Sequence, residues 1–191
     1  MKPVEVVLLA EDEQLSYFAR HFLQKYGYGP RDFTPIIAPP GCASQFVRER
    51  LPNELKAMRD SRKRSESRKK SKGKSTGRSR VLIVLTDCDN LSLKQRVATL
   101  SGECAANGVE WRKKGEPVLV ITPKRNIETW FEYLRGKPVD EEAKKKFKEF
   151  DAESECRPQV DELHKMCDKG KLRDGAPASL VAACEEWKLL A

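Results

Sequence analysis

Three carboxylates stand directly after two apolar runs, and their type suggests metal chemistry. Glu11 follows residues 4–10, and Asp87 and Asp89 follow residues 81–85. Hard cations such as Mg²⁺ and Mn²⁺ prefer carboxylate oxygens. A bound ion of this kind neutralises phosphate charge and activates water. The alternative is that these acids cap the following helices, where a negative charge favours the helix dipole.

The apolar runs themselves indicate an α/β fold. They are short and rich in β-branched residues, as is typical of buried parallel strands. The segments between these runs have apolar residues at helical spacing. We therefore expect a mainly parallel, four-stranded Rossmann-like sheet flanked by helices, with a C-terminal helical extension. The expected strands are residues 4–10, 33–38, 81–85 and 118–121, and Pro35 predicts that 33–38 is an edge strand. Ligands of such sheets bind outside the carboxyl ends of the strands, where the three acids should meet.

The positive charge is concentrated in one segment. The chain of 191 residues has 37 Lys+Arg and 29 Asp+Glu, a net charge of +8. Residues 59–80 hold eleven of the basic and two of the acidic residues, which leaves 26 basic and 27 acidic residues elsewhere. This segment has almost no apolar residues, so we expect a flexible basic insertion within a domain of residues 1–136. Residues 137–191 would form a helical cap.

Such a basic segment suits nucleic acid, because Lys and Arg bind phosphate backbones without reading sequence and the binding weakens with salt. The alternative is a solvated, tolerated insertion. The candidate phosphate-binding residues are Arg62, Lys63, Arg64, Arg68, Lys69, Lys70, Lys72, Lys74 and Arg78, together with Lys124 and Arg125 after the fourth strand.

Composition excludes other classes. Apolar residues make up 39% of the chain, enough for a core, and no run approaches the roughly 20 apolar residues of a membrane span. The six cysteines include no Cys-x-x-Cys pair, and no export signal is visible, so we expect a cytoplasmic protein with reduced thiols. Cys156, His164, Cys167 and Cys184 match no standard zinc spacing.

The pattern of an apolar strand ending in Glu and a later strand ending in Asp-x-Asp resembles the Toprim fold. The matching segments are Leu8-Leu9-Ala10-Glu11 and Asp87-Cys88-Asp89, within about residues 4–122. Residues 125–130 and 178–187 look like parts of small bacterial Toprim-like proteins related to nucleases of the overcoming-lysogenization-defect type. Members commonly have Gly after the first-strand Glu, where this sequence has Asp12.

The resemblance implies hydrolysis of phosphodiester bonds in DNA or RNA with Mg²⁺ or Mn²⁺. Asp87 and Asp89 would hold the ion, and Glu11 would complete the site or act as general acid/base. Glu128 would bind a second metal or position water. Phage defence is one setting that fits, and a protein partner in a larger complex is left open.

Two other interpretations stay open. In a receiver-like regulatory domain, Glu11 and its acidic neighbours would form the pocket, Asp87 would be phosphorylated, and Thr122 and Lys124 would act as the switch. The separation of 76 residues between Glu11 and Asp87 fits this poorly, since the insertion accounts for only 22 of them. A non-catalytic adaptor would instead use the basic segment to hold nucleic acid.

Overall fold

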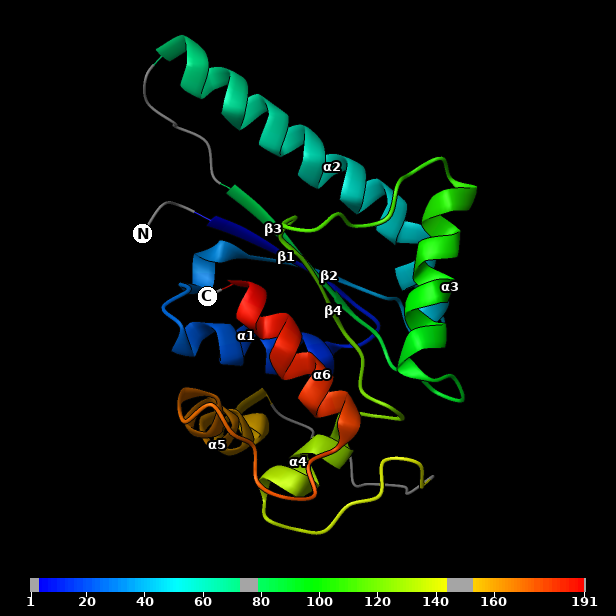
Figure 1. Ribbon diagram of the computed structural model, residues 1–191, viewed down its shortest axis with the longest axis vertical. Coiled ribbons are helices and arrows are strands. Elements are labelled where there is room, and N and C mark those ends of the chain that lie inside the picture. The colour runs from blue at the N-terminus through cyan, green and yellow to red at the C-terminus, as the bar shows by residue number, and fades with distance from the viewer. Residues whose placement is uncertain (1–3, 73–78, 144–152, 191) are drawn as a thin grey trace.

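The computed structural model describes residues 4–72, 79–143 and 153–190. Strands and helices alternate along most of the chain (Figure 1). The strands are β1 (Val4–Ala10), β2 (Phe33–Ile37), β3 (Ser79–Leu85) and β4 (Val118–Ile121). The α-helices are α1 (Glu13–Lys25), α2 (Ala43–Lys72), α3 (Leu93–Ala106), α4 (Glu128–Leu134), α5 (Arg157–Asp168) and α6 (Ala178–Trp187). Short 3₁₀ turns lie at Pro30–Asp32, Glu153–Cys156 and Lys188–Leu190.

The four strands form one parallel sheet in the order β2-β1-β3-β4, which confirms the predicted α/β fold. Ala10 pairs with Ile37 and Leu85, and Leu85 pairs with Ile121, so the carboxyl ends of all four strands are level. β2 is an edge strand, as Pro35 predicts, because proline cannot donate to a neighbouring strand. From β1 the chain continues to β2 on one side of the central strand pair, and from β3 it continues to β4 on the other side. The direction of the strand order therefore changes between β1 and β3, and ligands of open α/β sheets bind at such a switch point.

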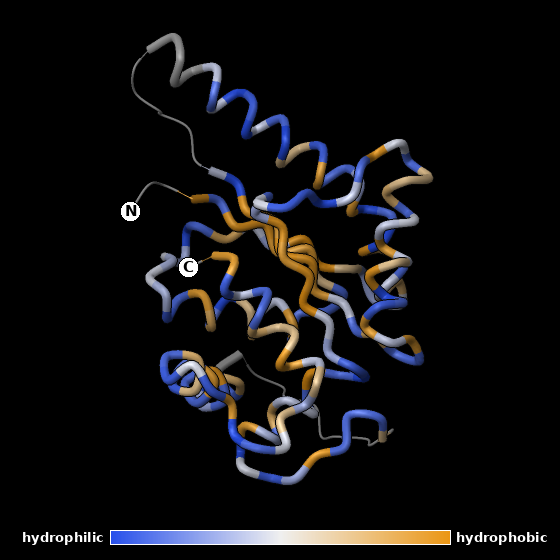
Figure 2. The backbone as a smooth tube through the Cα atoms, in the orientation of Figure 1, coloured by the Kyte–Doolittle hydropathy of each residue, from blue (hydrophilic) through white to orange (hydrophobic). Residues whose placement is uncertain are grey.

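Helices cover both faces of the sheet, and each face has its own buried cluster. Val6, Leu8 and Ala10 pack with α1, α4, α5 and α6, whereas Val7 and Leu9 pack with α2 and α3. This division follows from the alternation of side chains along a strand. Figure 2 shows the strands as the most hydrophobic part of the chain, between two layers of helices with mixed hydropathy.

The expected basic loop is wrong for residues 59–72, which continue α2 as one long helix. No Gly or Pro occurs between Asn53 and Lys72, and Arg, Lys and Glu are good helix formers. Arg62 also pairs with Glu66 one turn later, at 3.1 Å. The last two residues of the expected loop, 79–80, are also not in a loop, since they begin β3. Residues 73–78 lie outside the described residues.

The C-terminal helices share the core of the sheet. The carboxylate of Glu186 on α6 accepts hydrogen bonds from the Arg112 guanidinium and, at 3.0 Å, from the backbone N–H of Val120 in β4. Trp130 of α4 donates its indole N–H to the Ser179 hydroxyl of α6 at 2.9 Å. These bonds join α6 both to the edge of the sheet and to α4.

None of the described helices is long and apolar enough to cross a membrane.

Candidate functional site

Glu11 and Asp87 lie together at the switch point of the sheet. Glu11 is the first residue after β1, and its backbone N–H donates to Leu85 O at 3.0 Å. Its carboxylate bridges to the segment after β3, because Oε2 accepts from the Thr86 hydroxyl at 2.6 Å and from Asp87 N–H at 3.1 Å. The ends of β1 and β3 are therefore joined through one carboxylate oxygen, and Oε1 is not used in these two bonds.

Asp87 occupies the most unfavourable electrostatic position of the site. Asp87 is only 9% exposed, and its Oδ1 is buried with no hydrogen-bond partner among the described residues. Burial raises the pKa of this carboxyl well above its ordinary value, and nearby carboxylates add to the effect. The neighbours that raise it are Glu11, Asp12, Asp89 and Glu128. A buried polar atom without a partner is uncommon in folded proteins, and a bound cation is one arrangement that would satisfy it.

Burial also raises the pKa of Glu11, against the opposing hydrogen bonds from Thr86 and Asp87 N–H. Asp12 has a structural role, since it is the N-cap of α1 and its Oδ1 accepts from Leu15 N–H at 2.8 Å. Helix capping, the alternative considered for Glu11, is thus carried out by its neighbour Asp12. The hydrogen bonds of Glu11 run instead to the segment after β3.

Asp89 pairs with a cation of α3 and is largely exposed in this structure. Its backbone has a φ of 54°, in the left-handed region that few residues other than glycine adopt. Its Oδ2 accepts from the Arg96 guanidinium of α3 at 2.8 Å, and its side chain is 56% exposed. Ser92 is the N-cap of α3, so Asp89 is not needed for that task.

The other candidates near this edge have mixed roles. Glu128 is the first residue of α4 and is buried, and its charge contributes to the raised pKa of Asp87. Lys124 donates to Leu91 O at 3.0 Å and pairs with Glu142 at 3.1 Å, while Arg125 donates to the Asn90 side chain. Both cations thus bind to the segment after β3, and among the described residues the polar contacts of Lys124 are with Leu91 O and Glu142.

The donor set fits a hard cation in chemistry, although the side chains are not gathered around one point. Among the described residues, no group of three or more His, Cys, Asp or Glu side chains is arranged to hold a metal ion. Asp87 Oδ1 lacks a partner, whereas one oxygen each of Glu11 and Asp89 is already engaged. Reorientation of Asp89 away from Arg96 would free a further carboxylate, and Mg²⁺ usually keeps several waters.

The basic segment and the acidic residues lie at opposite ends of the sheet. α2 begins shortly after the carboxyl end of β2 and leads back toward the start of β3, and its outer half extends beyond the sheet there (Figure 1). At 1.5 Å per residue, its 30 residues span about 45 Å. The acidic residues lie at the other end of the sheet, directly after the carboxyl ends of β1 and β3. The basic outer half of α2 therefore does not lie beside the acidic residues.

Two cations at the borders of the segment are part of the fold. Arg59 donates to both carboxylate oxygens of Glu116 at 2.8 Å, and Arg80 lies 3.5 Å from Glu5 and 3.6 Å from Glu54. Arg62, Lys63 and Arg64 are exposed on α2. Arg68, Lys69, Lys70 and Lys72 belong to the helix, but their side chains are not described. Lys74 and Arg78 lie outside the described residues.

Two residues of this region have no counterpart among the sequence predictions. Thr86 orients Glu11 through its hydroxyl, and Arg96 holds Asp89. Arg96 is 4% exposed although it lies on a helix. Asp89 precedes Ser92, the N-cap of α3, so no helical spacing in the sequence relates it to Arg96.

Comparisons with known proteins identify no relative: no protein-family model, no curated protein and no solved structure matches the chain.

Proposed function

We propose that this chain is a divalent-cation-dependent phosphodiesterase that hydrolyses DNA or RNA. The observation that carries the proposal is Asp87, whose buried Oδ1 has no partner in the described part of the chain and whose pKa is raised by burial and by neighbouring acids. Folding stability alone would favour a neutral or apolar residue there, because an unpaired buried charge costs free energy. A cation would offset that cost.

The residues have distinct parts in this scheme. Asp87 and Glu11 would bind a divalent ion, with Asp89 as a further ligand and Glu128 as the candidate for a second ion or for positioning water. The ion would neutralise phosphate charge and lower the pKa of a bound water. Thr86 and Asp87 N–H fix one Glu11 oxygen, so the other has a defined direction in which to bind an ion or accept a proton.

Nucleic acid would reach the site across the length of the molecule rather than from an adjacent arm. The exposed cations Arg62, Lys63 and Arg64 sit on the outer half of α2, and phosphate contacts of this kind do not require sequence recognition. A short oligonucleotide could then occupy only one of the two regions, whereas a long polymer could contact both.

Cleavage assays with the purified chain test the proposal. Single- and double-stranded DNA and RNA are incubated with Mn²⁺, Mg²⁺ or EDTA, using wild type, Asp87→Asn and Asp60→Asn. Asp60 is an exposed acid on α2, so Asp60→Asn makes the same chemical change away from the site. Cleavage that requires metal and is lost only in Asp87→Asn supports the proposal. No cleavage of any polymer, together with no Mn²⁺ binding by calorimetry, overturns it.

Binding is tested separately. Substituting Arg62, Lys63 and Arg64 with Gln should weaken duplex binding and reduce the slope of log affinity against log salt by about 0.9 per lost phosphate contact. Binding that depends on these residues without any cleavage would favour the adaptor. Stable labelling of Asp87 by acetyl phosphate would favour the receiver-like domain.

A further inference from the structure

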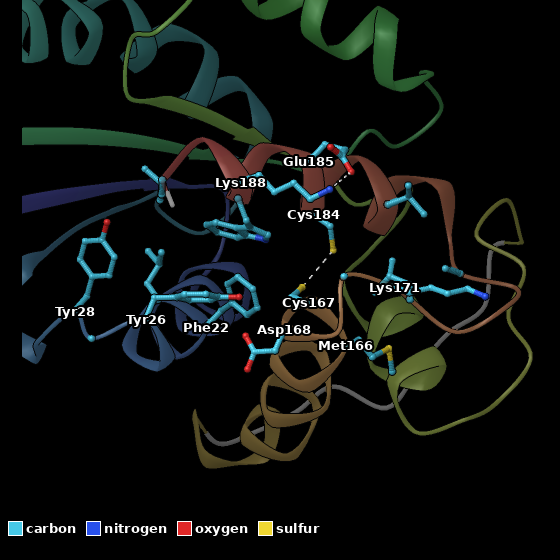
Figure 3. Close-up of a pocket in the computed structure, with 18 of the residues that line it drawn as sticks. Phe22, Tyr26, Tyr28, Met166, Cys167, Asp168, Lys171, Cys184, Glu185 and Lys188 are labelled. Atoms are coloured by element: carbon cyan, nitrogen blue, oxygen red, sulfur yellow. Dashed lines mark hydrogen bonds and ion pairs between the residues drawn. The ribbon is translucent and has the colours of Figure 1, made fainter.

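Two cysteines that are distant in sequence meet in the wall of a large pocket on the side of the sheet covered by α1, α5 and α6. Sγ of Cys167 on α5 lies 3.7 Å from Sγ of Cys184 on α6 (Figure 3). The pocket has a volume of about 1010 Å³, and both cysteines line it together with aromatic residues such as Phe22, Tyr26 and Trp187. Glu11, Asp87 and Asp89 are not among the residues that line this pocket.

We propose that Cys167 and Cys184 form a peroxide-sensitive dithiol that is converted reversibly to a disulfide. The two sulfurs already touch, and both side chains are partly exposed. A disulfide needs a separation of about 2.05 Å, so the sulfurs must approach further by rotation of the side chains and a small movement of the helices. The pocket gives a small oxidant a path to them.

The neighbouring groups distinguish the two sulfurs. The hydrogen bond between the thiols lowers the pKa of Cys167, and the same bond raises the pKa of Cys184. Lys188 also favours the Cys167 thiolate, whereas Asp168 disfavours it. Since the thiolate is the nucleophile, Cys167 would react first and Cys184 would resolve the product.

The reaction balances with hydrogen peroxide as the oxidant. The Cys167 sulfur attacks one peroxide oxygen; the S–O bond forms, the O–O bond breaks, and the released hydroxide takes the thiol proton to give water. The Cys184 sulfur then attacks the sulfenic sulfur; the S–S bond forms, the S–O bond breaks, and hydroxide leaves with the second thiol proton as water. Two thiols and one peroxide give one disulfide and two waters.

The disulfide would fasten the end of α5 to α6. Because α6 also holds β4 through Glu186, oxidation would tie this wall of the pocket to the sheet. The four other cysteines serve as internal references: Cys42 is exposed, and Cys88, Cys104 and Cys156 are buried. In the described part of the chain, Cys42, Cys88 and Cys104 have no second cysteine sulfur within contact distance.

Peptide mapping tests the proposal on the full chain. Reduced protein is treated with equimolar hydrogen peroxide, remaining thiols are alkylated in denaturant, and the digest is analysed without reduction. The expected result is a Cys167–Cys184 peptide pair that has lost two hydrogens (about 2 Da) and separates again with dithiothreitol. In Cys184→Ser, dimedone should trap a sulfenic acid on Cys167. Cys42→Ser should leave the cross-link unchanged.

Several outcomes would overturn it. Both thiols could stay fully alkylatable in protein with native circular dichroism, or the first cross-link could involve Cys42 or Cys156 instead. A Cys167–Cys184 bond that forms only in urea would also contradict it, because the native contact would then have no role. If a serine variant fails to fold, the wild-type map still decides.

Discussion

Neutralising Asp87 should stabilise the metal-free protein. Asp87→Asn keeps the size and shape of the side chain and removes a charge that is buried, lacks a partner at Oδ1 and is repelled by neighbouring acids. Most substitutions of buried polar residues destabilise a protein. An increase in stability would therefore be diagnostic of a position that folding by itself does not favour.

The size of the effect follows from the cost of a buried group without a partner, which is about 1–3 kcal/mol. For a chain of this length, each kcal/mol moves the unfolding temperature by roughly 2–4 °C. The folded protein holds the Asp87 proton to higher pH than the unfolded chain, whose Asp pKa is near the ordinary value of 3.8. Wild-type stability therefore falls as pH rises above that value, and the advantage of the variant grows until Asp87 is ionised in the fold.

Thermal unfolding followed by circular dichroism measures the difference in EDTA at pH 4 and pH 8, with Asp60→Asn as the control. We expect a gain for Asp87→Asn at pH 8, a much smaller gain at pH 4, and none for the control. Mn²⁺ at about 100 times its dissociation constant should add roughly 2.7 kcal/mol to wild type and much less to Asp87→Asn.

Two results would refute this reasoning. If Asp87→Asn lowers stability equally at both pH values, the carboxylate has an ordinary structural role. If Mn²⁺ stabilises wild type and the variant to the same extent, any cation binds elsewhere. Either result would also remove the support that Asp87 gives to the proposed phosphodiesterase.

Three further predictions address the surroundings of the site. Wild-type stability in EDTA should fall from pH 5 to pH 8, because the raised pKa values of Glu11 and Asp87 act in the same direction; a pH titration of urea unfolding checks this, and a rise would contradict it. Glu186→Ala should lose about 1–3 kcal/mol, since it leaves Val120 N–H and the Arg112 guanidinium without their acceptor; urea unfolding measures the loss, and Mn²⁺ affinity should not change. Arg96→Leu should tighten Mn²⁺ binding by releasing the Asp89 carboxylate, which calorimetry detects; weaker binding would show that Arg96 positions Asp89 for the ion.

The sequence by itself determined the four strands and the end of the sheet at which Glu11, Asp87 and Asp89 stand. Four apolar runs define the strands, Pro35 marks the edge strand, and the acids after β1 and β3 must lie at the same end of the sheet because the strands are parallel. These inferences depend on local patterns and on the geometry of parallel sheets, which do not require knowledge of packing. The helical course of residues 59–72 was also available from the sequence, in the absence of Gly and Pro and in the spacing of Arg62 and Glu66.

Only the tertiary structure decided which groups face one another. It paired Asp89 with Arg96, left Asp87 Oδ1 without a partner among the described residues, and placed Cys167 against Cys184. It also separated the basic half of α2 from the acidic residues at the carboxyl ends of the strands. A long helix that runs antiparallel to the strands ends near the amino ends of those strands. Side-chain partners distant in sequence are set by how whole helices pack, and no local pattern contains that information.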